Sequence, residues 1–249
     1  MYRNKEWLYN KYINEKLSTF QIDKLCGVSP TAIRYWLVKY NIPRRSIGES
    51  RHLATNNHCN LSQDAIEWID GELLGDGSLH KTSSYSALFS YSSKHLEYIE
   101  YVRDTLKSFG IEKTGKIYKQ KDRKTGAISY SCGFRSYPEL MVIYRRWYPN
   151  NKKIIPKDIK ITPLTLRQHY IGDGSLTHSK KQKPYIRLAT NGFKISDVNW
   201  LIKQLNKLGF KANRQRNGNV IRFLDCFTKD FLTYIGECPV KCYQYKWAI

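Results

Sequence analysis

The chain has 249 residues and carries 42 Lys and Arg against 21 Asp and Glu, a net charge of +21. Such an excess repels itself in a compact chain unless a polyanion offsets it, so nucleic acid is the first partner to consider. Hydrophobic residues make up 41% of the sequence, which excludes wholesale disorder. No run approaches the ~18 apolar residues of a membrane span. The N-terminal residues include no apolar signal segment, so we expect an intracellular protein that is not secreted and has no membrane partner.

Residues 1–45 predict a small all-helical domain. A first helix is expected over 5–16. Ser18 followed by Gln21 is the pattern of a capping box, and it opens a second helix that Gly27 ends. Ser29 caps a third helix, in which apolar residues recur at i, i+3, i+4 and i+7 and therefore share one packed face.

Two helices joined by a glycine turn are typical of a helix-turn-helix DNA-binding domain. The alternative is a three-helix packing module without DNA contact, and the arginine pair at 44–45 favours DNA binding. Side chains near the start of the third helix would meet base edges, and later basic residues would contact phosphates. The candidates are Thr31, Arg34 and Tyr35 for bases, and Lys39, Arg44 and Arg45 for phosphates.

Residues 46–60 are polar and show no periodicity, which predicts a linker. An extended chain rises ~3.3 Å per residue, so such a linker could span tens of ångströms. The small domain could then bind at a distance from the rest of the chain.

A five-residue block occurs twice in the remaining two thirds. Gly75–Leu79 repeats letter for letter as Gly172–Leu176, so the two aspartates lie 97 positions apart, from 76 to 173. Each block follows a predicted helix, over 62–74 or 162–171, and precedes the same order of strand, strand, helix, strand, strand, helix. The strands are expected over 79–81, 87–91, 116–120 and 128–134 in the first copy and over 176–180, 185–190, 212–216 and 220–223 in the second, with closing helices over 138–147 and 228–235.

Five identical residues within the same order of elements indicate a duplicated domain. The order αββαββα in both copies predicts an α+β fold with a pseudo-twofold axis. The first half is expected over 61–150 and the second over 151–249.

The repeated Gly-Asp-Gly turn indicates a site. Small residues at 71, 75 and 172 would let two helices approach closely and bring Asp76 and Asp173 together at one end. Two adjacent carboxylates repel each other, so one tends to take up a proton unless a divalent cation is present. Mg²⁺ accepts one or two carboxylates and also binds phosphate oxygens. Beside a basic surface this arrangement favours phosphodiester hydrolysis by metal-activated water, although a helix-exit turn copied by duplication is the alternative.

Residues 69–77, Ile-Asp-Gly-Glu-Leu-Leu-Gly-Asp-Gly, resemble the LAGLIDADG motif. Residues 166–174 form a weaker second copy, in which Arg167, Gln168 and His169 depart from the usual small and apolar letters. The stretches 150–156, 164–166 and 238–247 also resemble the single-chain homing endonucleases of this family. The resemblance covers residues 61–249, and the N-terminal helix-turn-helix would be an appended domain.

The resemblance implies a site-specific double-strand DNA endonuclease that acts as a monomer with Mg²⁺ or Mn²⁺. Asp76 and Asp173 would bind the metal, helped by the backbone carbonyls of Gly75 and Gly172. A basic residue near each site would polarise the water or steady the scissile phosphate. Lys153 and Lys246 occupy the matching places, 93 positions apart, from 153 to 246.

The resemblance also implies that the strands form two curved antiparallel saddles over DNA. Positions that face DNA should alternate with core positions along each strand. The polar and basic candidates are Lys81, Ser83, Lys116, Tyr118, Gln120, Arg123, His178, Lys180, Arg187, Arg214, Arg216 and Arg222.

Two other functions stay open from the sequence. An RNA maturase of the same fold would bind intron RNA and assist splicing, and net charge does not separate it from an endonuclease. Both aspartates and both lysines are present, which favours cleavage, because an RNA chaperone does not need them. A transcription regulator with an inactive nuclease-like domain fits the N-terminal helices but not a complete acidic pair.

Overall fold

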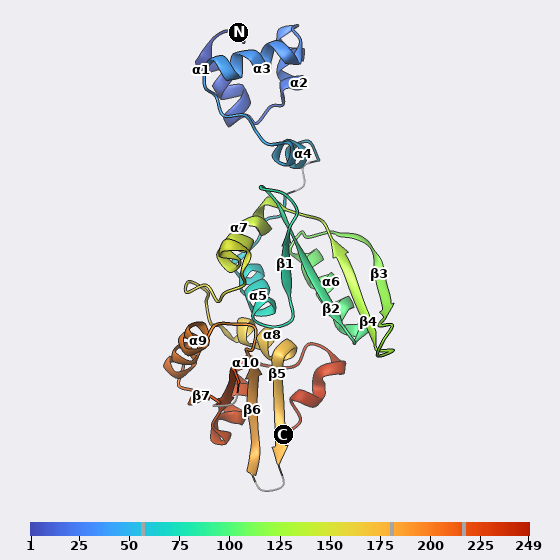
Figure 1. Cartoon of the computed structure of the whole chain (residues 1–249), viewed down its shortest axis with the longest axis vertical. Coiled ribbons are helices and arrows are strands. Elements are labelled where there is room, and N and C mark those ends of the chain that lie inside the picture. The colour runs from blue at the N-terminus through green and yellow to red at the C-terminus, as the bar shows by residue number, and fades with distance from the viewer. Residues whose placement is uncertain (56–57, 180–181, 216–217) are drawn as a thin grey trace. The chain divides into compact units, whose positions relative to one another are not determined.

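The computed structural model describes residues 1–55, 58–179, 182–215 and 218–249 (Figure 1). These residues fall into two compact units. The first comprises residues 1–58 with 83–86, and the second comprises 59–82 with 87–249. Apart from residues 83–86, both copies of the predicted repeat therefore share one folded body, the second unit.

The first unit begins with short helices whose ends are set by local sequence. They are α1 (Lys5–Tyr9), the π-helix η1 (Asn10–Asn14), α2 (Thr19–Cys26) and α3 (Pro30–Lys39). Ser18 and Gln21 form the predicted capping box, and Ser29 caps α3 as predicted. Gly27 ends α2 with φ 66°. The single helix predicted over 5–16 is instead α1 followed by η1, and Lys16 after them has φ 57°.

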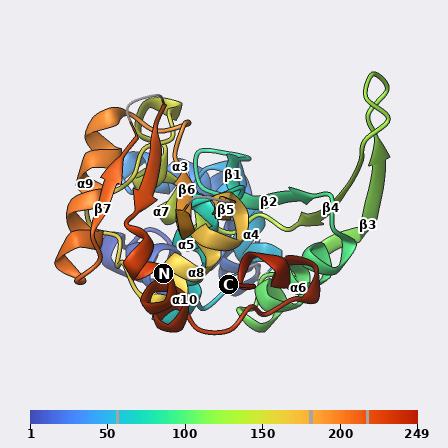
Figure 2. The ribbon, with the colours of Figure 1, turned by 90° about the horizontal axis from the view of Figure 1, so that it is seen from below.

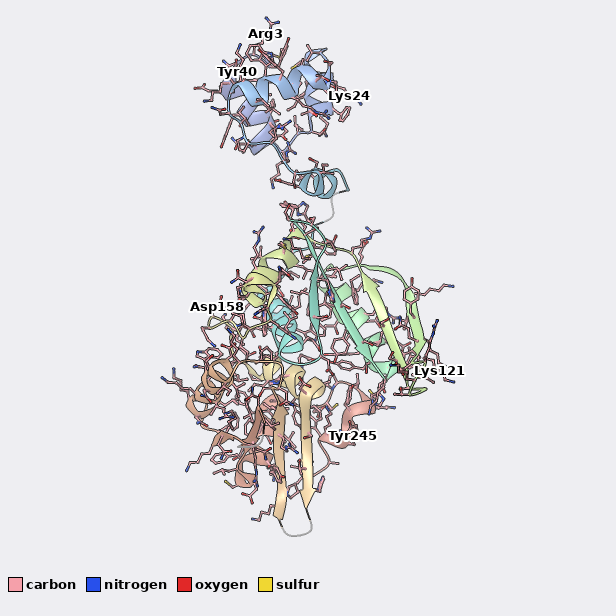
Figure 3. The ribbon with its side chains drawn as sticks, viewed as in Figure 1. Arg3, Lys24, Tyr40, Lys121, Asp158 and Tyr245 are labelled. Carbon is pink, nitrogen blue, oxygen red and sulfur yellow. The ribbon has the colours of Figure 1, made fainter. Side chains whose placement is uncertain are left out.

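This unit has an apolar core of its own. On α2, Ile22 is buried, whereas the apolar Leu25 is 56% exposed. Tyr40 donates a hydrogen bond to the carbonyl of Arg3, which ties the end of α3 to the N-terminal residues (Figure 3). The buried core residues are Leu8, Tyr12, Ile22, Ile33, Leu37 and Ile42.

The segment predicted as an irregular linker, 46–60, contains the helix α4 (Ile47–Thr55). Ser46 Oγ accepts a hydrogen bond from the backbone N–H of Glu49 at 3.1 Å. Ser-x-x-Glu is the sequence pattern of a capping box and could have predicted this helix. The prediction of a linker relied instead on the lack of apolar periodicity. Irregular structure is therefore not found over 47–55.

The second unit has the predicted order αββαββα twice. None of its helices, nor any other in the described parts of the chain, combines the length and apolar character that crossing a membrane requires. Short 3₁₀ segments also occur in this unit, namely η2 (Pro149–Asn151), η3 (Asp225–Phe227) and η4 (Lys241–Lys246). The first copy is α5 (Gln63–Leu74), β1 (Ser78–Lys81), β2 (Ala87–Ser93), α6 (Leu96–Ser108), β3 (Lys113–Lys121), β4 (Ile128–Phe134) and α7 (Pro138–Trp147). The second copy is α8 (Pro163–Asp173), β5 (Gly174–Ser179), β6 (Gln182–Ala189), α9 (Ile195–Lys207), β7 (Ala212–Arg214), β8 (Val220–Phe223) and α10 (Thr228–Ile235).

Each copy forms one four-stranded antiparallel sheet. The strand orders are β1-β2-β4-β3 and β5-β6-β8-β7, so the two sheets have equivalent topologies. Helices α6 and α7 pack against the first sheet, and α9 and α10 pack against the second. In Figure 2, β3 and β4 form a long hairpin that extends beyond α6. One continuous apolar core runs through both copies.

The two copies meet along helices α5 and α8. A Cβ atom on Gly71 would lie 2.6 Å from the carbonyl oxygen of Thr165, and one on Gly75 would lie 3.4 Å from Gly172 Cα. At Gly71 only glycine fits the backbone approach without a shift of the helices. The prediction that small residues let these two helices come close is confirmed.

Candidate functional site

Asp76 and Asp173 lie at the ends of the two seam helices in different local structures. Asp76 is exposed and lies beyond α5, where the N–H of Gly77 donates to the carbonyl of Glu72 at 2.8 Å. Asp173 is the last residue of α8 and is half-buried. The pair is therefore asymmetric although the flanking sequence is identical.

The two acidic turns are in contact. A Cβ on Gly172 would lie 3.1 Å from Asp76 N and 3.6 Å from Asp76 Oδ2. A Cβ on Gly75 would lie 3.6 Å from Asp173 N. Each aspartate thus adjoins the glycine of the other copy, and the structure brings together the two turns that the sequence predicted to meet.

The acidic pair is electrostatically strained. Burial, and then the nearby carboxylate of Asp76, raise the pKa of Asp173 to about 6, while Lys153 and Lys246 oppose this shift. A raised carboxyl pKa means that the folded protein holds this proton more tightly than the unfolded chain does. A cation between the acids would remove the conflict.

The pH dependence of stability should report this strain. Because the folded-state pKa of Asp173 lies above its unfolded value, its stabilising contribution is complete below about pH 4 and is lost as the pH rises through about 6. We expect the unfolding free energy of wild type, relative to that of Asp173→Asn, to fall between about pH 4 and 6.5 in EDTA. Denaturant titrations measure both; a constant difference across this range would contradict the raised pKa.

Lys153 and Lys246 lie on the backbone of the two turns. Lys153 Nζ donates to Gly77 O at 2.9 Å and to Gly75 O at 3.5 Å. Lys246 is buried, and its Nζ donates to Gly172 O at 3.2 Å. Burial lowers the pKa of each lysine to about 8, and the two aspartates act in the opposite direction. Each acidic turn therefore has one carboxylate and one amine beside it.

The donors at this seam suit a hard divalent cation. The two carboxylates adjoin the backbone carbonyls of Gly75 and Gly172, and oxygen ligands supplemented by water are what Mg²⁺ prefers. Across the residues that the structure describes, no three His, Cys, Asp or Glu side chains are grouped so that they could hold a metal ion. The residues present fit a cation that completes its shell with water and phosphate rather than with protein.

A buried polar layer lies beneath the acidic pair and was not singled out from the sequence. Glu72 is fully buried, Tyr98 donates to its Oε1 at 2.5 Å, and burial raises its pKa to about 8. His169 holds the equivalent motif position in the second copy and is also fully buried, which lowers its pKa to about 4. Both groups are thus uncharged near neutral pH. The sequence does contain a signal for this layer, namely polar residues within helices whose other seam positions are expected to be apolar.

In the first sheet, strand register places the candidates of β3 on the outward face. Tyr118 pairs with Ser131 and Gln120 pairs with Ser129, in rows that alternate with the buried Cys132. Residues directly opposite in antiparallel strands share a face, so these side chains point away from the core. The predicted alternation is found here, and Lys116 beside them is also exposed.

The β1–β2 hairpin differs from the expectation. Lys81 pairs with Ala87, which is fully buried, so Lys81 lies at the exposed end of a core-facing row. Ser83 Oγ accepts two backbone N–H groups within its own turn. The outward row contains His80 instead, which the sequence did not single out. Arg123, beyond β3, is exposed.

In the second sheet, two arginines face each other. Arg187 and Arg222 are direct partners in the register, and Arg222 lies 4.1 Å from the ring centre of Tyr185. Like charges directly opposite repel, so an anion between them would stabilise this face. Arg214 pairs with the fully buried Ile221 and therefore lies in the core-facing row at the sheet edge. His178 is exposed on β5, and Lys180 and Arg216 lie outside the described residues.

In the first unit, some candidate residues are exposed on the surface, and Arg45 instead stabilises the fold. Arg45 donates from its guanidinium to the carbonyls of Tyr12 and Lys16, each at 2.9 Å, and thereby holds the end of η1. Arg34, Arg44 and Arg45 line one cavity together with Lys16, which gathers positive charge there. Thr31, Arg34, Tyr35, Lys39 and Arg44 are exposed.

Residues 66–232 match the LAGLIDADG DNA endonuclease family. The uncharacterized protein MJ1098 of Methanocaldococcus jannaschii is 31% identical over 203 residues, which are 81% of this chain and 77% of that protein. Cytochrome b mRNA maturase bI2 of Debaryomyces hansenii is 29% identical over 168 residues, 64% of this chain and 62% of its own length. The homing endonuclease I-WcaI, solved bound to its DNA recognition sequence, has a similar fold, with a TM-score of 0.65 at 20% identity over 82% of this chain and 95% of that one.

The family match covers α5 from residue 66 onward, all of α8, both acidic turns and both sheets, whereas residues 233–249, with Lys246, lie beyond it. Residues 1–65, including α1 to α4, lie outside the matched range. Two motif copies in one chain agree with the duplicated architecture described above. The chain belongs to the LAGLIDADG DNA endonuclease family.

Proposed function

We propose that this protein is a site-specific double-strand DNA endonuclease that requires a divalent cation, Mg²⁺ or Mn²⁺. The observation that carries this proposal is the meeting of two acidic turns at one seam, with Asp76 and Asp173 each near a lysine amine. One acid per copy would let a single chain cut both strands, so a monomer would suffice.

In this proposal each group at the seam has one role. Asp76 and Asp173, with the carbonyls of Gly75 and Gly172, hold the cation. When bound, a divalent cation polarises a phosphodiester oxygen and lowers the pKa of a water molecule. The two lysine ammonium groups neutralise charge that develops on the scissile phosphate. Their pKa of about 8 leaves both largely protonated at neutral pH.

The experiment that tests the proposal is cleavage of a randomised duplex library in Mg²⁺, followed by sequencing of the new ends. A single recurring sequence among those ends is the expected result. EDTA should abolish the product, and the Asp76→Asn protein serves as the control for contaminating nucleases. Absence of wild-type cleavage in both Mg²⁺ and Mn²⁺ would contradict the proposal.

The lysines should act on separate strands. Lys153→Ala should slow cleavage of one strand about a hundredfold to a thousandfold, since removal of one stabilising donor costs on that scale. Lys246→Ala should slow the other strand. Strand-specific end labels on one duplex measure both rates, and Lys152→Ala, the exposed neighbour of Lys153, is the control. Equal slowing of both strands by each variant would argue against one lysine per half-site.

We further propose that α2 and α3 act as a helix-turn-helix that lengthens the bound site. The exposed residues on α3 and the basic cavity beside it support this role. Deleting residues 1–45 should weaken DNA affinity, shorten the footprint and reduce the salt dependence of binding by ~0.9 in log–log slope for each phosphate that the shortened protein no longer neutralises. Footprinting and salt titrations measure these effects, and an unchanged footprint would show that this unit contacts no DNA.

An RNA maturase is the second candidate, because a cytochrome b mRNA maturase is 29% identical over 64% of the chain. In that case intron RNA would be the partner and the acidic pair would not be needed. Splicing of the cognate intron by the Asp76→Asn protein, together with absence of DNA cleavage by wild type, would favour it.

A further inference from the structure

The segment that carries Lys246 is anchored by the opposite half of the second unit. This segment is η4, to which Tyr245, labelled in Figure 3, also belongs. Glu97, in the first turn of α6, accepts the backbone N–H groups of Lys241 at 2.7 Å and Cys242 at 3.0 Å. These two bonds hold the carboxylate ionised, since they lower the pKa of Glu97. A first-half carboxylate thus caps the second-half segment that ends in Lys246.

The segment that carries Lys153 is anchored in the reverse sense. Asp197, in the first turn of α9, is buried and accepts the backbone N–H of Ile155 at 3.4 Å. It also accepts Lys157 Nζ at 2.6 Å. Here a carboxylate of the second copy holds the segment that follows α7, the last helix of the first copy, just as η4 follows α10. The predicted boundary at 150 had assigned this segment to the second half, whereas its place after α7 makes it the equivalent of η4 in the first copy.

Aromatic rings repeat the same exchange. Tyr243 of η4 packs edge-on against Tyr98 of α6, with ring centres 5.1 Å apart. Phe193, which precedes α9, lies with its ring centre 5.7 Å from Lys153 Nζ. Each lysine segment therefore rests on the start of the equivalent helix of the other half, by a carboxylate and by an aromatic ring.

The tethers between anchors and lysines are short. Lys153 and Ile155 are two positions apart, and Cys242 and Lys246 are four positions apart. A residue spans at most ~3.6 Å, so removal of an anchor frees the attached backbone to move by several ångströms. Misplacement of a catalytic group by about 1 Å is enough to cost about a hundredfold in rate.

We propose that Glu97 and Asp197 are reciprocal positioning residues, each of which fixes the lysine that serves the turn of the opposite half. This inference rests on the proposed endonuclease function for its kinetic consequence, though not for its geometry. It makes the placement of each lysine depend on correct docking of the two halves. The contacts of both carboxylates described above are to the lysine-bearing segments, so both would act through the lysines.

Strand-specific cleavage tests the kinetic consequence in the full chain. Glu97→Gln should slow at least fivefold the same strand that Lys246→Ala slows, and Asp197→Asn should slow the strand that Lys153→Ala slows. The effect should fall on kcat with KM unchanged, and Glu97→Asp should restore part of the rate. Equal slowing of both strands by either variant would overturn the inference.

The matched control is Glu139→Gln. Glu139 lies in the first turn of α7 and accepts the backbone N–H of Cys59 at 3.3 Å, a similar anchor that bears no lysine of the site. It should leave the ratio of the two strand rates at the wild-type value. A strand bias as large as that of Glu97→Gln would show that general loosening explains the effect, and would overturn the proposal.

Lysine acylation tests the geometry without any nuclease activity. Full-length protein is treated briefly with an acetyl N-hydroxysuccinimide ester at about pH 8 and is digested for mass spectrometry. Glu97→Gln should increase acetylation of Lys246 at least fivefold and leave Lys153 unchanged, and Asp197→Asn should do the reverse.

The two failures are distinguishable. If wild type cuts no DNA but acylation follows this reciprocal pattern, the positioning roles of Glu97 and Asp197 are supported and the proposed function is contradicted. If wild type cuts DNA but the variants change neither the strand ratio nor the acylation pattern, the positioning roles are contradicted and the proposed function is supported. Circular dichroism establishes that each variant remains folded at the assay temperature.

Discussion

Asp76→Asn and Asp173→Asn should each abolish double-strand cutting while DNA binding is retained. Each substitution removes one carboxylate that would hold the cation, and catalytic metals supply several kcal/mol of transition-state stabilisation. At about 1.4 kcal/mol per factor of ten, double-strand cleavage should fall about a thousandfold or more. Affinity for the target should stay the same or increase, because each substitution removes a negative charge near the phosphates.

Cleavage of a labelled target duplex in Mg²⁺ and fluorescence anisotropy in Ca²⁺ measure the two quantities. Asp64→Asn is a matched control, because Asp64 is an exposed carboxylate in the first turn of the same helix, α5, at the end remote from the seam. It should cut at the wild-type rate. Undiminished cutting by either seam variant would refute the assignment of the acidic pair.

The asymmetry of the pair adds a second expectation. Asp173 is half-buried with a raised pKa, whereas Asp76 is exposed. The amide introduced by Asp173→Asn would fill the same space as the carboxylate without the cost of a buried charge, so this variant should bind DNA at least as well as Asp76→Asn. The two variants should differ in which strand they still nick.

Much of the second unit follows from local signals in the sequence. The strands β4 and β8 and the helices α7 and α10 have the predicted bounds. Ser62 and Thr162 accept the N–H groups of Ala65 and Thr165 and so fix the starts of α5 and α8. Caps and alternation act over three or four residues, so a single sequence shows them.

Long-range features could not be predicted in the same way. Whether Lys81 and Arg214 face outward depends on which strand lies beside them, because a shift of one residue in register reverses the face. The burial of Glu72 and His169 depends on tertiary packing, which places Glu72 against Tyr98 of α6 and His169 against Ala189 of β6. The anchors at Glu97 and Asp197 join residues more than 40 positions from their partners, a separation that no local pattern encodes.

In the first unit, some local structure was also missed from the sequence. Its helices α2 and α3 begin at the predicted caps, yet η1 and α4 were not predicted as such. Arg45 illustrates why charge alone is a weak guide to binding. In the sequence, an arginine that donates to backbone carbonyls at the end of a helix cannot be told from an arginine that contacts a phosphate.

Gly71→Ala should destabilise the whole second unit by about 2 kcal/mol, the usual cost of overpacking a tight core. The added Cβ would lie 2.6 Å from Thr165 O and 2.8 Å from Gln168 Cβ, and the first of these is backbone that cannot rotate away. Alanine is the better helix former by ~1 kcal/mol, so a net decrease in stability requires that the clash outweigh that gain. Helices α5 and α8 would have to separate, and the two acidic turns at their ends would separate with them.

Gly192→Ala is the control for this substitution, because a Cβ there meets nothing within 4 Å. Denaturant titrations compare the unfolding free energies of the two variants, and strand-cleavage assays below the transition show whether the folded Gly71→Ala protein still cuts. We expect lower stability together with at least tenfold slower cutting of both strands, because both half-sites share this seam. A Gly71→Ala protein as stable as Gly192→Ala would mean that the two helices can move apart at no cost. The fold would then not require the close approach that brings Asp76 to Asp173.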